Sequence, residues 1–412
     1  MNETPRVQQQ VGLGRARGIR VPVGLNTPVP EALAPEIERR LLFVSPEITE
    51  YDLIVTDGEV RGVSLTVDTP VPDDVLTQKV NHMVDTDIRT QWVTPGKTVW
   101  ASPYRPGAEA GVFERLLETG AVSVAGEGQV AIGEPLLSLF AYFDRSVREI
   151  LARDFTATEY RYPTLISTRA LEKSGYITSF PHHLMLVSRL HNDIDVYRAF
   201  QEKYADAGVD STVLGYCGNV DYCLPPTMCY HTFHQFQGST LESGRLQVVT
   251  SRGKSFRFEA AYAATLERLW DFTIREVVFL GSREDVLYAR GRFMRQVLDY
   301  VDGLGLSGSC EVGNDPFFSG ADTGARIWSQ RLMELKYELR LHVGADRSIA
   351  VASFNFHDDL FGKAFGINQG VDGPVRSGCV GFGLERLVYA FLCQYGVDPE
   401  RWPDAVRSGV AA

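Results

Sequence analysis

The motif FRFE, residues 256–259, pairs an arginine with a glutamate at a spacing that could bind a ligand. On an extended strand, residues two apart project from the same face, so Arg257 and Glu259 would point to one side. An arginine in that position suits an α-phosphate or a carboxylate, and the glutamate could accept a hydrogen bond from an amine. For this motif taken alone, a cross-strand salt bridge on a solvated face is the commoner outcome.

A second motif, GFGLERL at residues 381–387, joins a glycine-rich segment to the start of a helix. Gly381 and Gly383 would let the backbone approach a flat ligand closely, because glycine carries no Cβ. Arg386 would then stand at the beginning of the next helix, where its guanidinium could bind a phosphate. Taken alone, the pattern equally fits a structural strand–helix turn with a surface arginine.

The cysteines are the third group of residues that could carry chemistry. No two of them have the CxxC spacing of a zinc ribbon, so a metal site would need ligands from distant segments. In a chain of 412 residues without a recognisable export signal, thiols are expected rather than disulfides. A single buried cysteine is more often a small core residue, and spacing alone does not select a metal-binding pair. The cysteines are Cys217, Cys223, Cys229, Cys310, Cys379 and Cys393.

The N-terminal part of the chain is predicted to be a small α+β module. Residues 51–69 alternate apolar and polar side chains around Asp57-Gly58, which favours a β-hairpin with a positive-φ turn. Residues 73–88 begin with acidic residues and then place apolar side chains at helical spacing, which predicts a helix. The Pro- and Gly-containing stretch 92–108 is expected to be a linker.

The rest of the chain mixes long helices with strands that do not alternate regularly. Amphipathic helices are predicted within residues 133–155 and 282–305. Because no strand–helix–strand unit repeats, an antiparallel sheet flanked by helices is favoured over a parallel doubly wound sheet. The predicted fold class is α+β, with the module and its linker at 1–105 and a second domain at 106–412. Strand-like runs lie at 225–233, 246–251, 256–262, 273–281 and 348–356, and a strand leading into a helix at 378–396.

Composition and charge narrow the class of protein. With 44% hydrophobic and 23% charged residues, the chain has the composition of a soluble globular protein. No stretch approaches the roughly 18 consecutive apolar residues of a membrane helix, so no membrane partner is expected and the expected location is the cytoplasm. The net charge of −11 and the lack of a dense Lys/Arg run disfavour a nucleic-acid partner, although a local basic patch would suffice for one.

Taken in order, the segments FRFE, REVVFLG and GCVGFGLERL resemble motifs 2 and 3 of class II aminoacyl-tRNA synthetases. YRYPTLIS at 160–167, behind its long helix, resembles motif 1 of that class, whose usual role is dimerisation. Within the class, the resemblance is closest to the amino acid:carrier protein ligases, truncated relatives of the zinc-dependent seryl-tRNA synthetases of methanogens. The resemblance extends over roughly residues 110–395.

This resemblance implies a class II synthetase-like antiparallel sheet and a specific set of site residues. Cys229, Glu276 and Cys379 would hold a catalytic zinc, since two thiolates and one carboxylate leave a fourth position open for the substrate amino group. Arg257 would bind the α-phosphate of ATP, and Arg386 the γ-phosphate or its neighbour.

The remaining implied site residues concern ATP and magnesium. Glu259 would hold the adenine amino group, and Asn355 and Glu338 are placed to help with ATP, magnesium or the substrate. The acidic residue that typical synthetases place shortly before SFNF is missing from SIAVASFNF, so the magnesium ligands stay open. Zinc, ATP and magnesium are the implied cofactors.

The implied reaction is ATP-dependent activation of a small amino acid (glycine, alanine or serine) as its adenylate. The aminoacyl group would then pass to the phosphopantetheine thiol of an acyl or peptidyl carrier protein, and motif 1 implies a homodimer. One alternative is a zinc-dependent seryl-tRNA synthetase, favoured by the extra N-terminal module and disfavoured by the acidic charge. The other is a synthetase-like regulatory protein without catalysis, which would have no need of the phosphate-binding arginines.

Several other residues have a structural and a functional interpretation. Histidines at 182, 183, 231 and 234 lie near the predicted zinc segment, where packing is the commoner role for them. The helix at 284–301 could meet an acidic carrier through Arg290, Arg292 and Arg295, although a solvated helix face is the simpler interpretation. The role of Cys310 is open.

Overall fold

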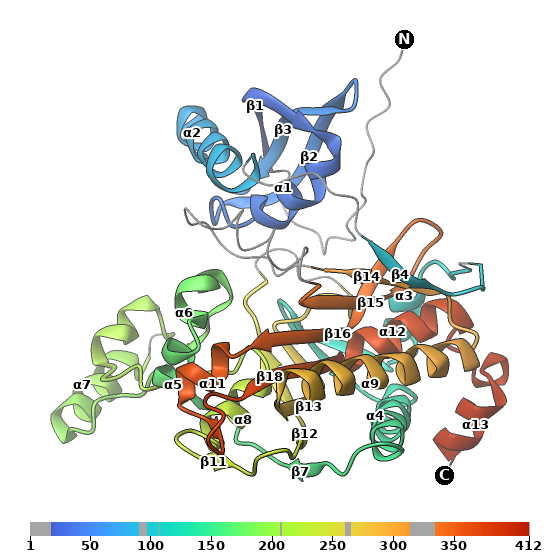
Figure 1. Ribbon diagram of the computed structural model, residues 1–412. Helices are drawn as coiled ribbons and strands as arrows, with labels where there is room; N and C mark the ends of the chain where they lie inside the picture. The colour runs from blue at the N-terminus through green and yellow to red at the C-terminus, as the bar shows by residue number, and fades with distance from the viewer. Residues whose placement is uncertain are drawn as a thin grey trace.

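The computed structural model describes residues 18–89, 97–105, 107–206, 208–259, 265–313 and 334–411. Figure 1 shows a small N-terminal module beside a larger domain built around a central sheet. Residues 92–96 and 106 of the predicted linker and residues 260–262 of the predicted strand lie outside the described residues. Among the described helices, none combines the length and the apolar character that crossing a membrane requires.

The N-terminal module is a three-stranded antiparallel sheet in the order β1-β3-β2, with two helices. The predicted hairpin is confirmed, because Asp57 and Gly58 adopt φ values of 53° and 75° between its strands. One face of the sheet and both helices enclose a separate apolar core, which includes Ile37, Leu65 and Val80. The elements are β1 Ile19–Pro30, α1 Ala34–Leu41, β2 Ile48–Thr56, β3 Glu59–Val67 and α2 Asp73–Met83, which continues into a π-helical turn at Val84–Ile88.

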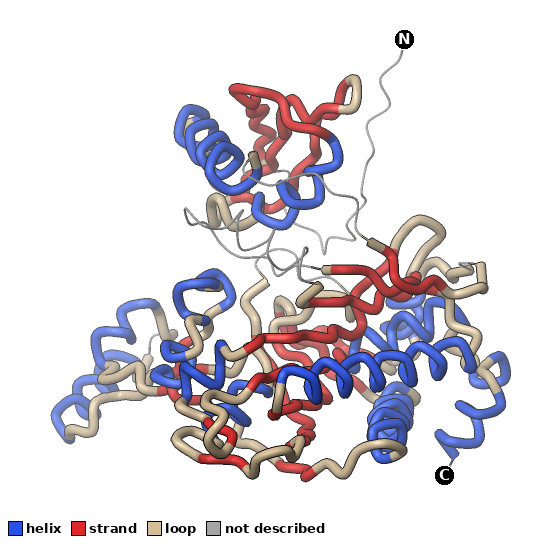
Figure 2. Tube along the Cα trace, viewed as in Figure 1, coloured by secondary structure: helices blue, strands red, loops and turns tan. Residues whose placement is uncertain are grey.

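The larger domain contains an eight-stranded sheet in the order β4-β14-β15-β16-β18-β13-β12-β7, drawn in red in Figure 2. Neighbouring strands are antiparallel except for the edge pair β12 and β7. The strands are β4 Thr98–Ala101, β7 Thr158–Tyr160, β12 Gln247–Phe256, β13 Asp271–Gly281, β14 Gly308–Val312, β15 Lys336–His342, β16 Ser348–Asp358 and β18 Arg376–Gly383.

Helices cover both faces of this sheet. On one face, α4, α9 and α12 enclose the larger core, to which Val277 and Phe279 belong. On the other face, α5, α8 and α11 enclose a smaller core that includes Val278, Leu280 and Cys379. Residues of β13 therefore alternate between the two cores, as strand pleating requires. The helices are α4 Leu136–Ala152, α5 Thr168–Lys173, α8 Cys229–Gln235, α9 Arg283–Gly303, α11 Leu360–Phe365 and α12 Leu384–Tyr395.

The other helices and strands lie in the connections and at the C-terminal end. Helix α7, drawn away from the central sheet in Figure 1, buries none of its residues. These elements are α3 Val112–Glu118, β5 Val122–Gly126, β6 Gln129–Ile132, β8 Ile166–Ser167, α6 Tyr176–Ser179, β9 Leu186–Val187, α7 Ile194–Tyr204, β10 Tyr222–Cys223, β11 Thr240–Leu241, β17 Asn368–Gln369 and α13 Asp404–Ala411.

The structure differs from the sequence expectation at three segments. The strand predicted at 256–262 ends at Phe256, because its partner β13 begins at Asp271, the residue opposite. The segment 225–233 forms a helix from Cys229 onward rather than a strand. The predicted linker contains β4, which pairs with β14 at the edge of the large sheet. The division of the chain at residue 105 stays a prediction.

Candidate metal and nucleotide site

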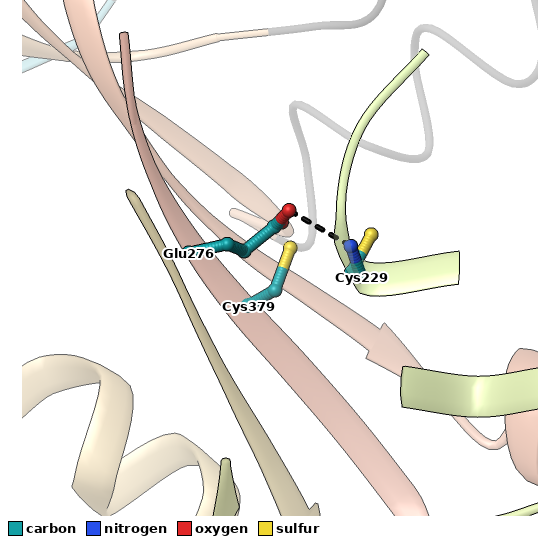
Figure 3. Close-up of side chains that lie close together, drawn as sticks. All are labelled: Cys229, Glu276 and Cys379. Atoms are coloured by element: carbon teal, nitrogen blue, oxygen red, sulfur yellow. Dashed lines mark hydrogen bonds between the residues drawn. The ribbon is translucent and has the colours of Figure 1, made fainter. Parts of the chain in front are cut away.

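Three side chains from distant parts of the chain converge on one face of the central sheet. The sulfurs of Cys229 and Cys379 and a carboxylate oxygen of Glu276 all lie within 4.8 Å of one another, and all three residues are buried. Figure 3 shows the three side chains close together. Within the described residues, no second group of three such ligands is found. The structure thus brings together the three residues that the resemblance implied, and we refer to them as the cluster.

Strand pairing positions two members of the cluster. Glu276 on β13 lies opposite Gly381 on β18, two residues from Cys379, so Glu276 and Cys379 are diagonal neighbours on one face. A Cβ at Gly381 would lie 3.8 Å from Glu276 Oε1, so the glycine leaves this face of the site open. Cys229 is the first residue of α8, which packs against β13.

The start of α8 fixes the carboxylate of Glu276. Its Oε2 accepts hydrogen bonds from the Thr227 hydroxyl at 2.7 Å, the Met228 N–H at 2.9 Å and the Cys229 N–H at 2.8 Å. Amides at a helix N-terminus have no partner within the helix, and they favour negative charge. Oε1 accepts none of these three bonds, so it is available to a metal ion. Figure 3 shows the bond to Cys229 as a dashed line.

The two cysteines favour the thiol form as long as no cation is near. The hydrogen bond with Cys229 and burial raise the pKa of Cys379 well above its usual value. The hydrogen bond with Cys379 acts to lower the pKa of Cys229, but burial and the Glu276 charge outweigh it and raise that pKa. Two thiolates and a carboxylate in so small a buried volume need a cation to neutralise them. This donor set fits zinc with one open coordination position.

Two further polar side chains face Cys379. Asn355 on β16 lies opposite Cys379 in the strand register, and its Nδ2 is 3.5 Å from the cysteine Sγ. His357, two residues later, has its Nε2 3.6 Å from the same sulfur and its Nδ1 3.2 Å from the Ser377 hydroxyl oxygen. Sequence reasoning assigned Asn355 to ATP, magnesium or substrate and overlooked His357. Its place two residues after Asn355 on one strand was the signal that could have found it.

Arg257 and Glu259 follow directly after the end of β12. Arg257 donates from Nε to the Pro226 carbonyl oxygen at 3.1 Å, and its guanidinium carbon lies 5.5 Å from the centre of the Phe272 ring. Glu259 is 6% exposed and accepts a hydrogen bond from Arg268 at 3.0 Å. Arg268 is a second residue of this group that sequence reasoning missed, because it lies outside any recognised motif.

Arg386 is the third residue of α12, as predicted, and lies in the same electrostatic neighbourhood. Its Nε donates to the Glu267 carbonyl oxygen at 2.6 Å. Burial lowers the pKa of Arg386 to about 10; the charges of Arg268 and Arg257 act in the same direction, whereas that of Glu259 opposes them. The guanidinium therefore stays cationic at neutral pH. A buried glutamate surrounded by three partly exposed arginines can bind the phosphates and the base of a nucleotide.

Glu338 on β15 lies opposite Ser353 of β16, near the same group of charges. Its carboxylate pairs with Lys336 at 3.1 Å and Arg340 at 3.3 Å. Burial acts to raise the pKa of Glu338, but these two cations outweigh it and lower that pKa. The carboxylate is therefore ionised, although two side chains already share its charge.

His182 and His183 lie beside Arg257 and Glu259 and not in the cluster. The His183 carbonyl oxygen accepts from the Phe258 N–H at 3.3 Å, between Arg257 and Glu259. Burial lowers the pKa of His182 to about 4 and that of His183 to about 2, so both rings are neutral at neutral pH. Phe43 of the N-terminal module contacts His182, with 4.9 Å between the ring centres.

Other residues singled out in the sequence are buried or paired with neighbouring side chains. Cys310 is buried in the larger core, where burial raises its pKa to about 12. Arg290 is 8% exposed and lies over the ring of Tyr337, with 4.9 Å from its guanidinium carbon to the ring centre. Arg292 is paired with Asp154. Arg290 is therefore not presented to solvent, although it is one of the three arginines on α9 that were considered for an acidic partner.

The opposite face of β13 carries a buried ion pair and a cavity. Arg275, next to Glu276 and 2% exposed, donates to both carboxylate oxygens of Asp144 on α4, at 2.6 and 2.9 Å, and to Glu159 at 2.8 Å. A cavity of about 1300 Å³ lies between α4, β7 and β12, and Arg275 is among its lining residues. None of the cluster residues lines this cavity.

Comparison with known proteins identifies two groups of relatives. No family model matches the chain. The amino acid–acyl-carrier-protein ligases 1 and 2 of Bradyrhizobium diazoefficiens are 34% and 33% identical over 249 and 253 residues, about 60% of this chain and 74% and 72% of theirs. A type-2 serine–tRNA ligase of Methanococcus aeolicus is 29% identical over 298 residues, 69% of this chain and 56% of that protein. The chain thus spans little more than half of this second type of relative.

Solved structures share the fold at low sequence identity. A complex of M. kandleri SerRS with A. aeolicus tRNASec matches 95% of this chain and 77% of its own, with a TM-score of 0.69 and 21% identity. A Naegleria fowleri serine–tRNA ligase with AMP matches 82% and 71%, with a TM-score of 0.59 and 12% identity. The predicted class II synthetase-like fold is confirmed.

Proposed function

The chain belongs to the family of the amino acid–acyl-carrier-protein ligases, and on that basis we propose that it activates a small amino acid with ATP and passes it to a carrier protein. The reaction class, a ligase, follows from the relatives. Glycine, alanine and serine are the proposed substrates. The convergence of Cys229, Glu276 and Cys379 is the observation that carries the proposal, because this donor set fits a substrate-binding metal.

The cluster would select the substrate through its amino group. When bound, zinc would offer its open position to the neutral α-amino group and so fix the amino acid in orientation. The hydrogen bonds from the start of α8 hold Glu276 in place for this role. The open backbone at Gly381 keeps the face beside Glu276 clear for a small substrate.

The arginines would stabilise the activation step. The substrate carboxylate oxygen attacks the α-phosphorus of ATP, the bond to the bridging oxygen breaks, and pyrophosphate leaves. Arg257 would neutralise charge on the α-phosphate and Arg386 on the γ-phosphate or its neighbour, while Glu259 would accept from the adenine amino group. Magnesium would accompany ATP, with Glu338 as the proposed contact.

The second half-reaction would transfer the aminoacyl group to a phosphopantetheine thiol. The thiol sulfur attacks the carbonyl carbon of the adenylate, a thioester forms and AMP leaves. Because a thiolate is a strong nucleophile and AMP a good leaving group, positioning suffices for this step. An acyl or peptidyl carrier protein is the proposed partner, since the family relatives are named for one.

A second candidate function is charging of tRNA with serine. The type-2 serine–tRNA ligases favour it, because one from Methanothermobacter thermautotrophicus matches 339 residues, 79% of this chain, at 26% identity. The Bradyrhizobium ligases match only about 60%. We rank this function second because the chain carries a net charge of −11.

We also propose that the chain acts as a homodimer through the region of α4 and β7. Strand β7 is an edge of the sheet, and the apolar side chains of Leu137, Tyr160 and Leu165 are 51%, 36% and 39% exposed beside it. An exposed edge strand with apolar neighbours is usually covered by a partner. Sedimentation equilibrium of the full chain tests this proposal; a monomer at all concentrations would contradict it.

Purified full-length protein tests the function in two stages. ATP–pyrophosphate exchange is measured with glycine, alanine and serine, and with glycolate and lactate as matched acids that lack the amino group. We expect exchange with at least one amino acid and none with the hydroxy acids. Radiolabelled amino acid is then offered with phosphopantetheinylated carrier protein and, separately, with bulk tRNA. Label on the carrier supports the proposal, label on tRNA alone supports the second function, and absence of any exchange leaves a non-catalytic role.

A further inference from the structure

Cys379 differs from the other cluster cysteine in having two nitrogen donors directed at its sulfur. We propose that His357 and Asn355 are positioning residues that hydrogen-bond to the Cys379 sulfur and thereby set its orientation and its affinity for the metal. The proposal rests on the zinc site of the proposed function and adds two residues to it. Both are on β16, one strand away from Cys379 on β18.

The strand register places the two donors beside the sulfur. Asn355 is the residue directly opposite Cys379, and its Nδ2 lies 3.5 Å from Sγ. The same nitrogen lies 3.1 Å from the Ser353 hydroxyl oxygen. An amide nitrogen carries two hydrogens, so one can point to each acceptor. Asn355 is thereby oriented with its nitrogen, and not its oxygen, toward the sulfur.

The hydrogen bond at Nδ1 is compatible with a proton on the other ring nitrogen of His357. Nδ1 lies 3.2 Å from the hydroxyl oxygen of Ser377, a residue that is fully buried. The Ser377 hydroxyl can donate to Nδ1 or accept from it; in the proposed arrangement it donates, and the proton of a neutral ring is on Nε2, 3.6 Å from Cys379 Sγ. Ser377 and Cys379 are on the same face of β18, so one strand supplies both partners of the ring.

Aromatic packing holds the His357 ring in this orientation. The ring centre lies 4.8 Å from that of Phe361 and 5.9 Å from that of Phe233, and both contacts are edge-on. Phe361 and Phe233 belong to the smaller core together with Cys379. A ring fixed between two helices and a strand loses little further freedom when it donates to the sulfur.

His357 is a donor to the ligand and not a ligand itself. The group of possible metal ligands within 4.8 Å of one another comprises the three cluster residues and does not extend to His357. Hydrogen bonds to a thiolate stabilise its negative charge in a buried site, and they fix the direction of its lone pairs. Partners of this kind typically contribute about 10- to 100-fold to metal affinity.

Metal binding by the full chain tests the proposal with a readout other than activity. Zinc affinity is measured by competition with a chromophoric chelator, and the cobalt-loaded protein is examined by its sulfur-to-cobalt charge-transfer band. For His357→Phe we expect about 10- to 100-fold weaker zinc binding. We also expect a shift of the band to longer wavelength, because a sulfur that has lost a donor releases its electrons more easily. Asn355→Ala should act in the same direction, and Ser377→Ala should have a smaller effect.

Two controls separate the hydrogen bond from packing. His357→Phe keeps an aromatic ring between Phe233 and Phe361, so metal-free protein should fold, and its unfolding temperature should decrease no further than in Ser377→Ala, which removes the same hydrogen bond. His234→Gln changes an exposed histidine on α8, the helix of Cys229, and should leave affinity and band unchanged. If His357→Phe fails to fold, Asn355→Ala and Ser377→Ala decide by the same readouts.

The possible outcomes distinguish this inference from the proposed function. One outcome is that the unsubstituted chain binds zinc while His357→Phe and Asn355→Ala both keep its zinc affinity and its cobalt band. That result would overturn the inference and leave the zinc site intact. Failure of the unsubstituted chain to bind zinc or cobalt would overturn the zinc site, and the inference with it. Weaker binding with a shifted band supports both.

Discussion

The cluster proposed to bind a metal and the residues proposed to bind the nucleotide, here the metal half and the nucleotide half, are positioned in different ways. The cluster rests on strand register and a helix start: Glu276 and Cys379 are diagonal neighbours, and Glu276 accepts two main-chain N–H bonds from α8. The nucleotide half lies where strands end. Arg257 follows the last residue of β12, and Arg386 donates to a main-chain carbonyl oxygen.

This difference suggests what each half needs. A metal site requires several ligand atoms at fixed separations, which paired strands supply, and its thiols have raised pKa values until a cation arrives. A phosphate site requires cations directed at the charge that develops in the reaction, and main-chain carbonyl oxygens hold Arg257 and Arg386 by their Nε atoms. Substitutions in one half should therefore leave the function of the other half unchanged. Four predictions test this independence, from the largest expected effect to the smallest.

The largest effect is expected from removing a cluster thiol. Cys379→Ser should lower zinc content from about one ion per chain to near zero. Amino-acid-dependent pyrophosphate exchange should fall by about 1000-fold or more, since a metal contributes several kcal/mol to such a step. Metal analysis and exchange are measured on the same sample. Cys223→Ser, a buried cysteine of the same small core outside the cluster, is the control and should keep both. Unchanged zinc in Cys379→Ser would show that another thiol is the ligand.

Substitution in the nucleotide half should reduce exchange without loss of metal. Arg386→Ala removes a cation from the partly buried group of charges, and exchange should fall by about 100- to 1000-fold. Zinc content should equal that of the unsubstituted chain. Loss of zinc in Arg386→Ala would contradict the independence of the two halves.

The loss of folding stability at acidic pH should reveal the neutral histidines beside the nucleotide half. Burial lowers the pKa of His183 from 6.5 to about 2, so the unfolded chain binds more protons than the folded chain below pH 6.5. The contribution of His183 to stability is complete above that pH and declines on acidification, by about 2 kcal/mol at about pH 5. His183→Phe keeps a ring in place of the stacked imidazole and should remove this loss.

Urea unfolding at about pH 7 and about pH 5 measures the effect of His183→Phe. The difference in unfolding free energy between the two pH values should be smaller in the variant than in the unsubstituted chain. An equal difference in both proteins would mean that His183 titrates normally in the folded state.

The smallest effect is expected from a charge outside both halves. Arg292 on α9 is paired with Asp154, and its side chain is 45% exposed. Arg292→Ala should change exchange and carrier aminoacylation by at most about two-fold, because exposed ion pairs contribute little. A ten-fold rise in the carrier concentration needed for half-maximal rate would instead assign this helix face to carrier binding.

The sequence was sufficient to predict the helices and strands in which apolar residues recur with a clear period. The helices at 136–152 and 283–303, the hairpin around Asp57-Gly58 and the strand of Glu276 all follow from apolar spacing and turn residues. The sequence was insufficient at 225–233, where a short apolar run fits a strand and a helix equally well. Tertiary packing of Tyr230 and Phe233 on one side of α8 decides for the helix.

Only part of the candidate site could be predicted from the sequence, because some of its contacts depend on tertiary packing. Motif resemblance identified the cluster residues, although their spacing alone did not select Cys229 and Cys379 among the cysteines. Arg268 and His357 were missed. Arg268 lies outside any recognised motif, and the contact of His357 with Cys379 depends on which residues meet across strands, so its position two residues after Asn355 was its only signal in the sequence. The pairing of β16 with β18 brings Asn355 beside Cys379, and Ser377 lies on the same strand as Cys379. This register is set only in the folded sheet.

X-ray absorption at the zinc edge tests the central claim most directly, because it reports the atoms around the metal without reference to activity. For zinc-loaded protein we predict two sulfur neighbours at about 2.3 Å and lighter neighbours at about 2.0 to 2.2 Å. Addition of a substrate amino acid should change the lighter shell and leave the two sulfurs in place. A shell with no sulfur, or with four, would contradict the assignment of Cys229, Glu276 and Cys379 to one metal with an open position.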